Sequence, residues 1–387
     1  MTYPFRSFVA PVAALAFVTS MPWAAVAQQD TLADLVGKAL IGTMTKVSGD
    51  VFAYETARFD EASNTVVLEK VTLTRDKAKR PSVLIDATKI LAPVMMDNGG
   101  FTADAVTTEN VTLQSRALSG TIASATASNV AVQPADQIVK GALSQWFRYE
   151  TSSVLDIQLG GKADARPLKI ARFDSVANID ANNIPVAGDV TVEGISVAVK
   201  DIGRKRIRED ILDLGYETLD ISVKAKGAYD PESDTLTVES LNITGEDAAT
   251  LTMSASIGGI PESFMASPLD PRAIIATASI GNLDLNIDDQ SLTGRVLSSQ
   301  AKKMGTDRDA LAAQLSGALP FFLAALQNEA FQKEVAEAVT SFLSDPKNFR
   351  VAMKPEKPTP FIQVFAALTS APGTVVELLG LSISANQ

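Results

Sequence analysis

One short strand pattern recurs along this chain and restricts its fold. In the clearest copy, Leu236 and Val238 alternate with polar residues, and Leu241 and Ile243 alternate again after two polar positions. In a regular strand the second apolar pair would face away from the first, because side chains alternate between the two faces. A β-bulge at Glu239-Ser240 would bring all four apolar side chains to one face. The pattern therefore predicts bulged antiparallel strands with one apolar and one polar face.

The same pattern occurs in four other segments. Its change of phase falls at Glu69-Lys70, Glu193-Gly194 and Gly281-Asn282 in the three stronger copies. Repeated bulges bend and twist strands, so the pattern predicts curved sheets. A tight corner between two separate strands is the alternative explanation. The apolar pairs are Val66/Leu68 with Val71/Leu73, Val190/Val192 with Ile195/Val197, Ala278/Ile280 with Leu283/Leu285, and the weaker Val106/Thr108 with Val111/Leu113.

An internal duplication is predicted from four landmarks that occur twice in the same order. Residues 59–74 align with residues 229–244 at an offset of 170, with five of sixteen positions identical. The offset grows slowly along the remaining landmarks. Convergent hairpin chemistry is the alternative, since Asp, Ser and Thr suit any turn. The other matched segments are 110–113 with 282–285, 118–124 with 292–298, and 141–143 with 317–319.

The predicted fold class is α+β, with mainly antiparallel, curved sheets in two duplicated units, covering helices and a helical C-terminal section. Hydrophobic alternation marks β structure in segments 45–132, 153–159, 168–199 and 219–297. Helical spacing marks 31–41, 134–147, 204–214, a helix capped by Thr306 and interrupted at Pro320, 329–343, 361–368 and 374–379. The predicted parts are a signal peptide (1–27), a first β-rich unit (28–150), a connecting β segment (151–202), a second unit (203–345) and a strand-helix-strand section (346–387).

The N-terminus has the composition of a secretory signal peptide. Arg6 is the only charge before Asp30, an apolar stretch follows, and Ala25-Val26-Ala27 forms a small-x-small cleavage site. Pro11 and Pro22 interrupt the apolar stretch, which disfavours a permanent membrane helix. We expect an exported protein; an uncleaved membrane anchor is the alternative.

Composition restricts the chemistry further. The chain has no Cys and no His, which excludes disulfides, Ser-His-Asp and Cys-His nucleophiles, and zinc or haem sites that need those ligands. The net charge of −11 argues against nucleic-acid binding, which needs a basic surface. We predict no cofactor and no metal.

The segment Ser299-Gln-Ala-Lys302 matches the Ser-x-x-Lys form of serine acyl-enzymes, but the companion motifs of those enzymes are missing. A solvated start of a helix is the preferred interpretation. Asp284, Asp288 and Asp289 lack the loop of a calcium site, and Asp220 and Asp230 are isolated in the pattern. We therefore predict no catalytic, cofactor-binding or metal-binding residue and no enzymatic activity.

Two basic clusters and two apolar surfaces could serve membrane contact. The clusters are Arg204-Lys205-Arg206-Arg208 and Arg75/Lys77/Lys79/Arg80, which could meet anionic lipid headgroups. Solvated loops are the preferred interpretation of both. Burial in the core is preferred for Phe321-Phe322-Leu323 and for the apolar face of 329–343, with membrane or partner docking as the alternative.

Beyond these features, the chain resembles uncharacterised exported proteins of Gram-negative envelopes and, more distantly, the AsmA-like β-rich envelope proteins. The resemblance is carried by the five strand patterns, by Leu214-Gly-Tyr216, and by the ending from Asp345-Pro-Lys to Leu381-Ser-Ile-Ser-Ala-Asn386. AsmA-like proteins are membrane-anchored, often much longer, and linked to lipid traffic through a hydrophobic groove. The resemblance implies a periplasmic location. This chain is shorter and its anchor looks cleavable, and no site residues of that family can be transferred.

The predicted function is that of a non-enzymatic cell-envelope protein that holds lipid or another apolar ligand in a curved β-sheet trough and serves envelope maintenance. The alternative is a structural or protein-interaction scaffold with a filled core and no ligand. Candidate partners are lipid, a membrane surface or envelope proteins, and not nucleic acid.

Overall fold

In a computed structural model the chain divides into two compact units at Pro185/Val186, a boundary inside the predicted connecting segment 151–202. The predicted signal peptide, most of the predicted helix 134–147 and most of the basic cluster at Arg75 lie outside the described residues. The structure describes residues 31–75, 81–114, 119–137, 147–160, 168–180, 184–266, 275–324 and 327–387.

The first unit begins with a helix, as the sequence predicts. Thr31 and Asp34 form a capping box in which each side chain accepts from the other's backbone N–H, and Gly49 ends the helix in the left-handed conformation. The helix extends beyond the predicted end at residue 41. The elements are α1 (Leu32–Ser48), β1 (Val51–Ala53), β2 (Thr56–Asp60), β3 (Thr65–Thr74), β4 (Val83–Leu91), β5 (Val94–Met95), β6 (Phe101–Gln114), β7 (Ser119–Val132), the 3-10 turn Ala135–Gln137, β8 (Phe147–Arg148), β9 (Thr151–Gly160) and β10 (Leu168–Ile179).

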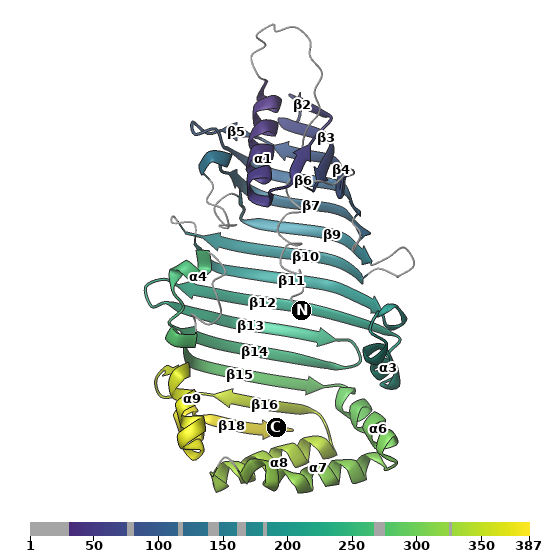
Figure 1. Cartoon of the computed structure of the whole chain (residues 1–387), viewed down its shortest axis with the longest axis vertical. Helices are drawn as coiled ribbons and strands as arrows, with labels where there is room; N and C mark the ends of the chain where they lie inside the picture. The colour runs from purple at the N-terminus through teal and green to yellow at the C-terminus, as the bar shows by residue number, and fades with distance from the viewer. Residues whose placement is uncertain are drawn as a thin grey trace. The chain divides into compact units, whose positions relative to one another are not determined.

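These strands form an antiparallel sheet with a filled core. The long strands pair in the order β3, β4, β6, β7, β9, β10, and β1 and β2 both pair with β3. Helix α1 lies over one face of this sheet (Figure 1). Its Val36 and Leu40 join Phe101 and Leu68 in one cluster of fully buried side chains. Along β6, buried and more exposed positions therefore alternate, and most apolar side chains lie at the buried ones, as a covered face requires.

A row of irregular positions crosses this sheet at one level, and we call this row the crease. Lys70, Asn110 and Asp156 are left-handed residues on β3, β6 and β9, and they lie opposite Asp86 and Ala123 on the strands between them. The pairing skips these positions and continues in the same register on both sides. The predicted change of phase at Glu69-Lys70 is thus present, but without the register shift of a bulge. Because each strand carries its extra residue at the same level, the shifts cancel.

We expect the crease to tolerate glycine and to resist β-branched residues. Asn110 is exposed and has φ of 53°, a conformation that is unfavourable for most L-residues. Asn110→Val should lower the free energy of unfolding by about 1–2 kcal/mol relative to Asn110→Gly. Urea unfolding of the two variants measures this difference. Equal stabilities would contradict the left-handed assignment.

The second unit contains an antiparallel sheet followed by helices. The structure confirms, within a few residues, the helices predicted at 204–214, 329–343 and 361–368. The elements are β11 (Pro185–Ala198), the 3-10 turn Val199–Asp201, α3 (Lys205–Asp213), β12 (Thr218–Asp230), β13 (Thr235–Gly245), β14 (Ala249–Gly258), α4 (Glu262–Ala266), β15 (Ser279–Asp289), α6 (Leu292–Met304), α7 (Arg308–Leu323), α8 (Glu329–Ser344), β16 (Asn348–Met353), β17 (Thr359–Pro360), α9 (Phe361–Ser370), the 3-10 turn Pro372–Thr374, α10 (Val375–Leu379) and β18 (Leu381–Ala385).

Three predictions for the helices of this unit are wrong. Residues 292–297, predicted as β, begin α6, because Asp289 caps this segment through the backbone N–H and the hydroxyl of Thr293. Asp307, not Thr306, caps α7, since its carboxylate accepts from the N–H of Ala310 at 2.8 Å. Pro320 lies in the last turn of α7 and does not break its middle.

The predicted bulges of the second unit are confirmed. Register shifts occur between Val192 and Ile195 of β11 and between Val238 and Leu241 of β13. A third shift leaves Gly281 of β15 without a partner in β14. Each pattern lies within a single strand, so the alternative of a corner between two strands is wrong. The apolar pairs on both sides of each bulge face the same side of the sheet.

Candidate functional site

The second unit presents one continuous apolar sheet surface. Cross-strand partners lie on the same face of a sheet, so the register shows which side chains share a surface. Three successive rows of such partners are apolar, and together they extend from β11 to β18. We call this surface the apolar face; its rows are Val192, Val223, Ile243, Leu251, Ile287 and Phe349; Val190, Ala225, Leu241, Met253, Leu285, Val351 and Ile383; and Val238, Ala255, Leu283, Met353 and Leu381.

The apolar face is open over most of its extent. Leu251 and Met253 are only half-buried, in the same class as Thr250 and Thr252 on the opposite face of β14, and Ile243 is 37% exposed. Among the described helices, none makes an extensive contact with β12, β13 or β14. At one end, α8 packs on β18 and β16 (Figure 1). The strong alternation of burial seen in β6 is therefore missing from β14.

The opposite face of the same strands is polar and ion-paired. Asp284 accepts two hydrogen bonds from the guanidinium of Arg350, with Nε at 2.8 Å from Oδ1. These hydrogen bonds hold the pKa of Asp284 below its usual value. Lys226 pairs with Glu239 on this face, beside the bulge of β13. The sheet of the second unit thus separates a charged face from an uncharged one.

The acidic residues considered as metal or acid/base candidates have structural partners or stand apart. Asp288 accepts from Asn286 at 2.9 Å, and Asp289 caps α6. Asp220 and Asp230 lie at opposite ends of β12. No group of three acidic side chains that could hold a metal ion occurs among the residues the structure describes.

Asp230 instead builds a hairpin turn that closely matches a turn of the first unit. Its carboxylate accepts from the N–H of Glu232 and the hydroxyl of Ser233. Asp60 accepts from the N–H two residues on and from the hydroxyl of Ser63 in the same way. The serine hydrogen bond lowers the pKa of each aspartate.

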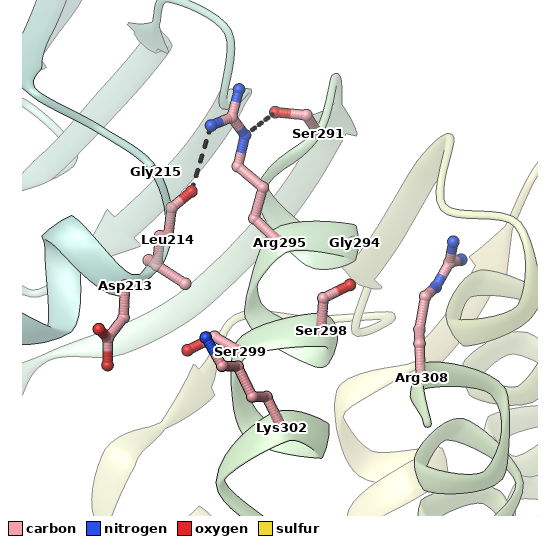
Figure 2. A pocket seen from close by; sticks show the side chains of 10 residues that line it. All are labelled: Asp213, Leu214, Gly215, Ser291, Gly294, Arg295, Ser298, Ser299, Lys302 and Arg308. Atoms are coloured by element: carbon pink, nitrogen blue, oxygen red, sulfur yellow. Dashed lines mark hydrogen bonds between the residues drawn. The ribbon is translucent and has the colours of Figure 1, made fainter. Parts of the chain in front are cut away.

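A cationic cleft of about 510 Å³ lies beside α6 in the second unit (Figure 2). Its wall along α6 carries Ser291, Arg295, Ser298 and Lys302, which recur at helical spacing and so share one face of the helix. Arg308 at the start of α7 also lines the cleft, as does the C-terminal end of α3. We call this feature the cationic cleft.

The structure places both residues of the Ser-x-x-Lys match in the cationic cleft. Ser299 is 8% exposed and Lys302 is exposed, and no hydrogen bond between them is present in the described part of the chain. Sequence reasoning missed Arg295 and Arg308. The spacing from Ser291 to Lys302 is typical of one helical face. The sequence prediction of β structure over residues 219–297 covers the first half of this segment.

The structure shows where the basic cluster at Arg204 and the two apolar segments lie. Arg208 donates to the carbonyl of Ile202 at 2.8 Å and Lys205 pairs with Glu209, so this cluster forms the start of α3. Phe321 and Phe322 are 82% and 70% exposed, which makes the prediction of core burial wrong for both. The amphipathic face of α8 is buried through Phe331, Val335 and Ala338, as expected.

Lys303 joins α6 to α3 and gives the second unit a predictable response to alkaline pH. Its ammonium lies 3.1 Å from Asp210 and 2.9 Å from Asp213, and these hydrogen bonds raise its pKa above the ordinary 10.5. The contact therefore stabilises the fold fully below the unfolded-state pKa and is lost as pH rises through the raised folded-state pKa. Urea unfolding at stepped pH should show this loss above about pH 10.

Lys303→Arg provides the matched control, because arginine keeps its charge throughout this range. We expect the wild-type midpoint to fall more steeply than that of Lys303→Arg between about pH 10 and 12. Parallel curves for the two proteins would contradict the assigned role of Lys303.

Part of the second unit matches a family of known proteins. A family described only as an uncharacterised protein matches residues 242–386, which include β14 to β18, the cationic cleft wall on α6 and the exposed phenylalanines. Among curated proteins, none matches the chain. None of the helices that the structure describes is long and apolar enough to cross a membrane.

Proposed function

We propose that the protein is a non-enzymatic envelope protein whose second unit holds the acyl chains of a lipid on the apolar face. The single observation that carries the proposal is the open stack of in-register apolar rows from β11 to β15. Large exposed apolar patches on a protein mark interaction sites, and a polar, ion-paired reverse face excludes a two-sided core. The proposal also includes the periplasmic location and the AsmA-like character expected from the sequence.

The dimensions of the apolar face suit an acyl chain. Four inter-strand steps of about 4.8 Å give a surface roughly 19 Å across, whereas one leaflet of hydrocarbon is about 15 Å deep. Burial of each methylene contributes about 0.8 kcal/mol, against at least about 4 kcal/mol for immobilising a ligand. A chain with more than about five buried methylenes therefore offsets this minimum cost, and each further methylene adds to binding. This estimate favours long-chain or diacyl lipids over short fatty acids.

Exposed apolar side chains on two helices support contact with a membrane surface. Phe321 and Phe322 lie at the end of α7, with ring centroids 5.7 Å apart. Ile362, Phe365 and Leu368 of α9 are also exposed and share one helical face, and α9 contains no charged residue. Aromatic and aliphatic side chains on a helix surface insert into the boundary between headgroups and acyl chains.

The test is native mass spectrometry of protein isolated from a Gram-negative periplasm without detergent. We expect mass additions that match lipids, which are released on unfolding and identified in the organic extract. A second assay measures displacement of a fluorescent fatty acid by diacyl lipid. Protein that carries no lipid and displaces no probe would refute the proposal. A dimer that hides the apolar face, detected by sedimentation, would favour the scaffold alternative.

We also propose that the two units arose by duplication and that their sheets are curved. The matched segments 118–124 and 292–298 do not support the duplication, because the described part of the first lies in strand β7 and the second lies in helix α6. The matched turns at Asp60 and Asp230 support a common origin. In each turn the aspartate accepts from the backbone N–H two residues on and from the hydroxyl of a serine three residues on. The left-handed residues Asn64 and Asp234 occupy equivalent places after these turns. The bulges of β11, β13 and β15 support curvature of the second sheet.

A further inference from the structure

The cationic cleft carries an excess of positive charge in an acidic protein. Arg295, Lys302 and Arg308 line it, and Asp213 is the only acid among its lining residues. Asp213 is already engaged by the ammonium of Lys303 at 2.9 Å. In the described part of the chain, none of the three lining cations forms an ion pair with a carboxylate. The chain as a whole has a net charge of −11, so such a concentration of uncompensated cations is a local feature.

Two hydrogen bonds orient Arg295 and leave other N–H groups of its guanidinium without a partner among them (Figure 2). Its Nε donates to the hydroxyl of Ser291 at 2.9 Å and its Nη1 donates to the carbonyl of Leu214 at 3.1 Å. The guanidinium also lies 4.5 Å from the ring centre of Tyr216. A guanidinium has five N–H donors, so three remain for a ligand. A positioned arginine of this kind binds oxyanions with little loss of side-chain freedom.

Arg308 adds an unsatisfied donor from a second helix. Its Nη2 reaches the carbonyl of Ser344 at 3.4 Å, while its Nε is buried and has no hydrogen-bond partner among the described residues. A buried donor without a partner is unfavourable, so a change of rotamer that brings the Arg308 guanidinium to a ligand oxygen in the cleft would be favoured. The donors of Arg295 and Arg308 thus come from α6 and α7, which border one cleft.

Two glycines keep the cleft open. Gly215 has φ of 84°, and a Cβ there would lie 3.2 Å from Nη1 of Arg295, so a side chain would crowd the guanidinium. At Gly294, on the cleft wall, a Cβ would meet no atom within 4 Å. The second position therefore accepts a side chain without a clash inside the folded protein.

We propose that the cationic cleft binds a phosphate group. Three cations exceed the charge of a single carboxylate and suit a phosphate ester, which carries about one and a half to two negative charges at neutral pH. Bidentate guanidinium contacts and serine hydroxyls match the tetrahedral arrangement of phosphate oxygens. The phosphate could belong to a free anion or to a lipid headgroup, and the inference does not depend on lipid binding at the apolar face.

The decisive variant is Gly294→Glu, which adds a carboxylate to the cleft wall at a position where a Cβ meets no atom within 4 Å. Calorimetry at pH 8 measures binding of inorganic phosphate and, separately, of dihexanoyl phosphatidate below its micelle concentration. We expect saturable binding by the wild type and at least about tenfold weaker binding by Gly294→Glu, because a charge-assisted contact becomes a repulsion. Arg295→Met should weaken binding to a similar extent.

Two controls separate the site from general helix effects. Gly294→Ala should bind as the wild type does. Gly317→Glu makes the same substitution on α7, at a position where a Cβ also meets no atom within 4 Å and which does not line the cleft. Thermal unfolding confirms that each variant is folded. Dihexanoyl glycerol, which lacks phosphate, reports on apolar contacts alone and should be unaffected by Gly294→Glu.

The two ligands identify the source of the phosphate. Binding of inorganic phosphate that Gly294→Glu weakens supports a site for the free anion. Binding of phosphatidate alone, with the same dependence on Gly294, supports a headgroup site. If neither ligand binds, or if Gly294→Glu binds both as tightly as the wild type, the proposal is overturned.

Discussion

Met253→Lys is expected to abolish lipid retention while leaving the second unit folded. Met253 lies at the centre of the apolar face, between Leu241 and Leu285 on the neighbouring strands. A lysine that faces hydrocarbon destabilises the contact by about 2–4 kcal/mol. Binding of a fluorescent acyl probe should therefore weaken by about 30-fold or more. Native mass spectrometry of the same variant should show the loss of co-purifying lipid.

Ser254→Lys is the matched control, because the next residue of the same strand faces the other way. Its register partner on β15 is Asp284, so an added ammonium meets a negative charge and no lipid. We expect Ser254→Lys to retain the probe with unchanged affinity. The stability of Met253→Lys provides a second measurement. A loss of more than about 3 kcal/mol would indicate that Met253 belongs to a filled core, as in the scaffold alternative.

Leu68→Ala in the first unit should have the largest effect on stability. The Leu68 side chain is 0% exposed and packs in the cluster covered by α1. Removing a leucine from such a position leaves a cavity and lowers the free energy of unfolding by about 2–5 kcal/mol. Hydrogen exchange of peptides from β3 and β4 during urea unfolding measures the change within this unit.

The same truncation on the apolar face should have a much smaller effect. Leu251 is half-buried and has no described helix over it, so Leu251→Ala removes cross-strand contacts but opens no enclosed cavity. We expect a loss of about 1 kcal/mol, measured by exchange of peptides from β13 and β14. Equal losses for Leu68→Ala and Leu251→Ala would mean that the apolar face is covered in solution.

The strands and their changes of phase could be predicted from the sequence because apolar alternation is a local signal. The form of each irregularity could not. At Glu239-Ser240 one strand bulges against a regular neighbour, whereas at Lys70 the neighbouring strands carry extra residues at the same level. Only the pairing between strands separates the two cases, and pairing is not encoded in any single segment.

The candidate site depended even more on tertiary structure. Arg295 and Lys302 lie on one helix, but Arg308 and Asp213 come from other elements, and no local pattern joins them. The exposure of Phe321 and Phe322 also could not be predicted, because an apolar pair within a helix ordinarily indicates burial in the core. The missed half of the cleft wall followed from assigning residues 292–297 to a strand.

The crease in the first unit has a consequence for how its strands find their partners. Alternation rejects a pairing slipped by one residue, because such a slip turns apolar side chains outward, but a slip by two residues keeps every side chain on its own face. A two-residue slip would bring Asn110 opposite a regular residue and separate it from Asp86 and Ala123. We therefore expect the left-handed residues at Lys70, Asn110 and Asp156 to favour the native pairing over the pairing slipped by two residues.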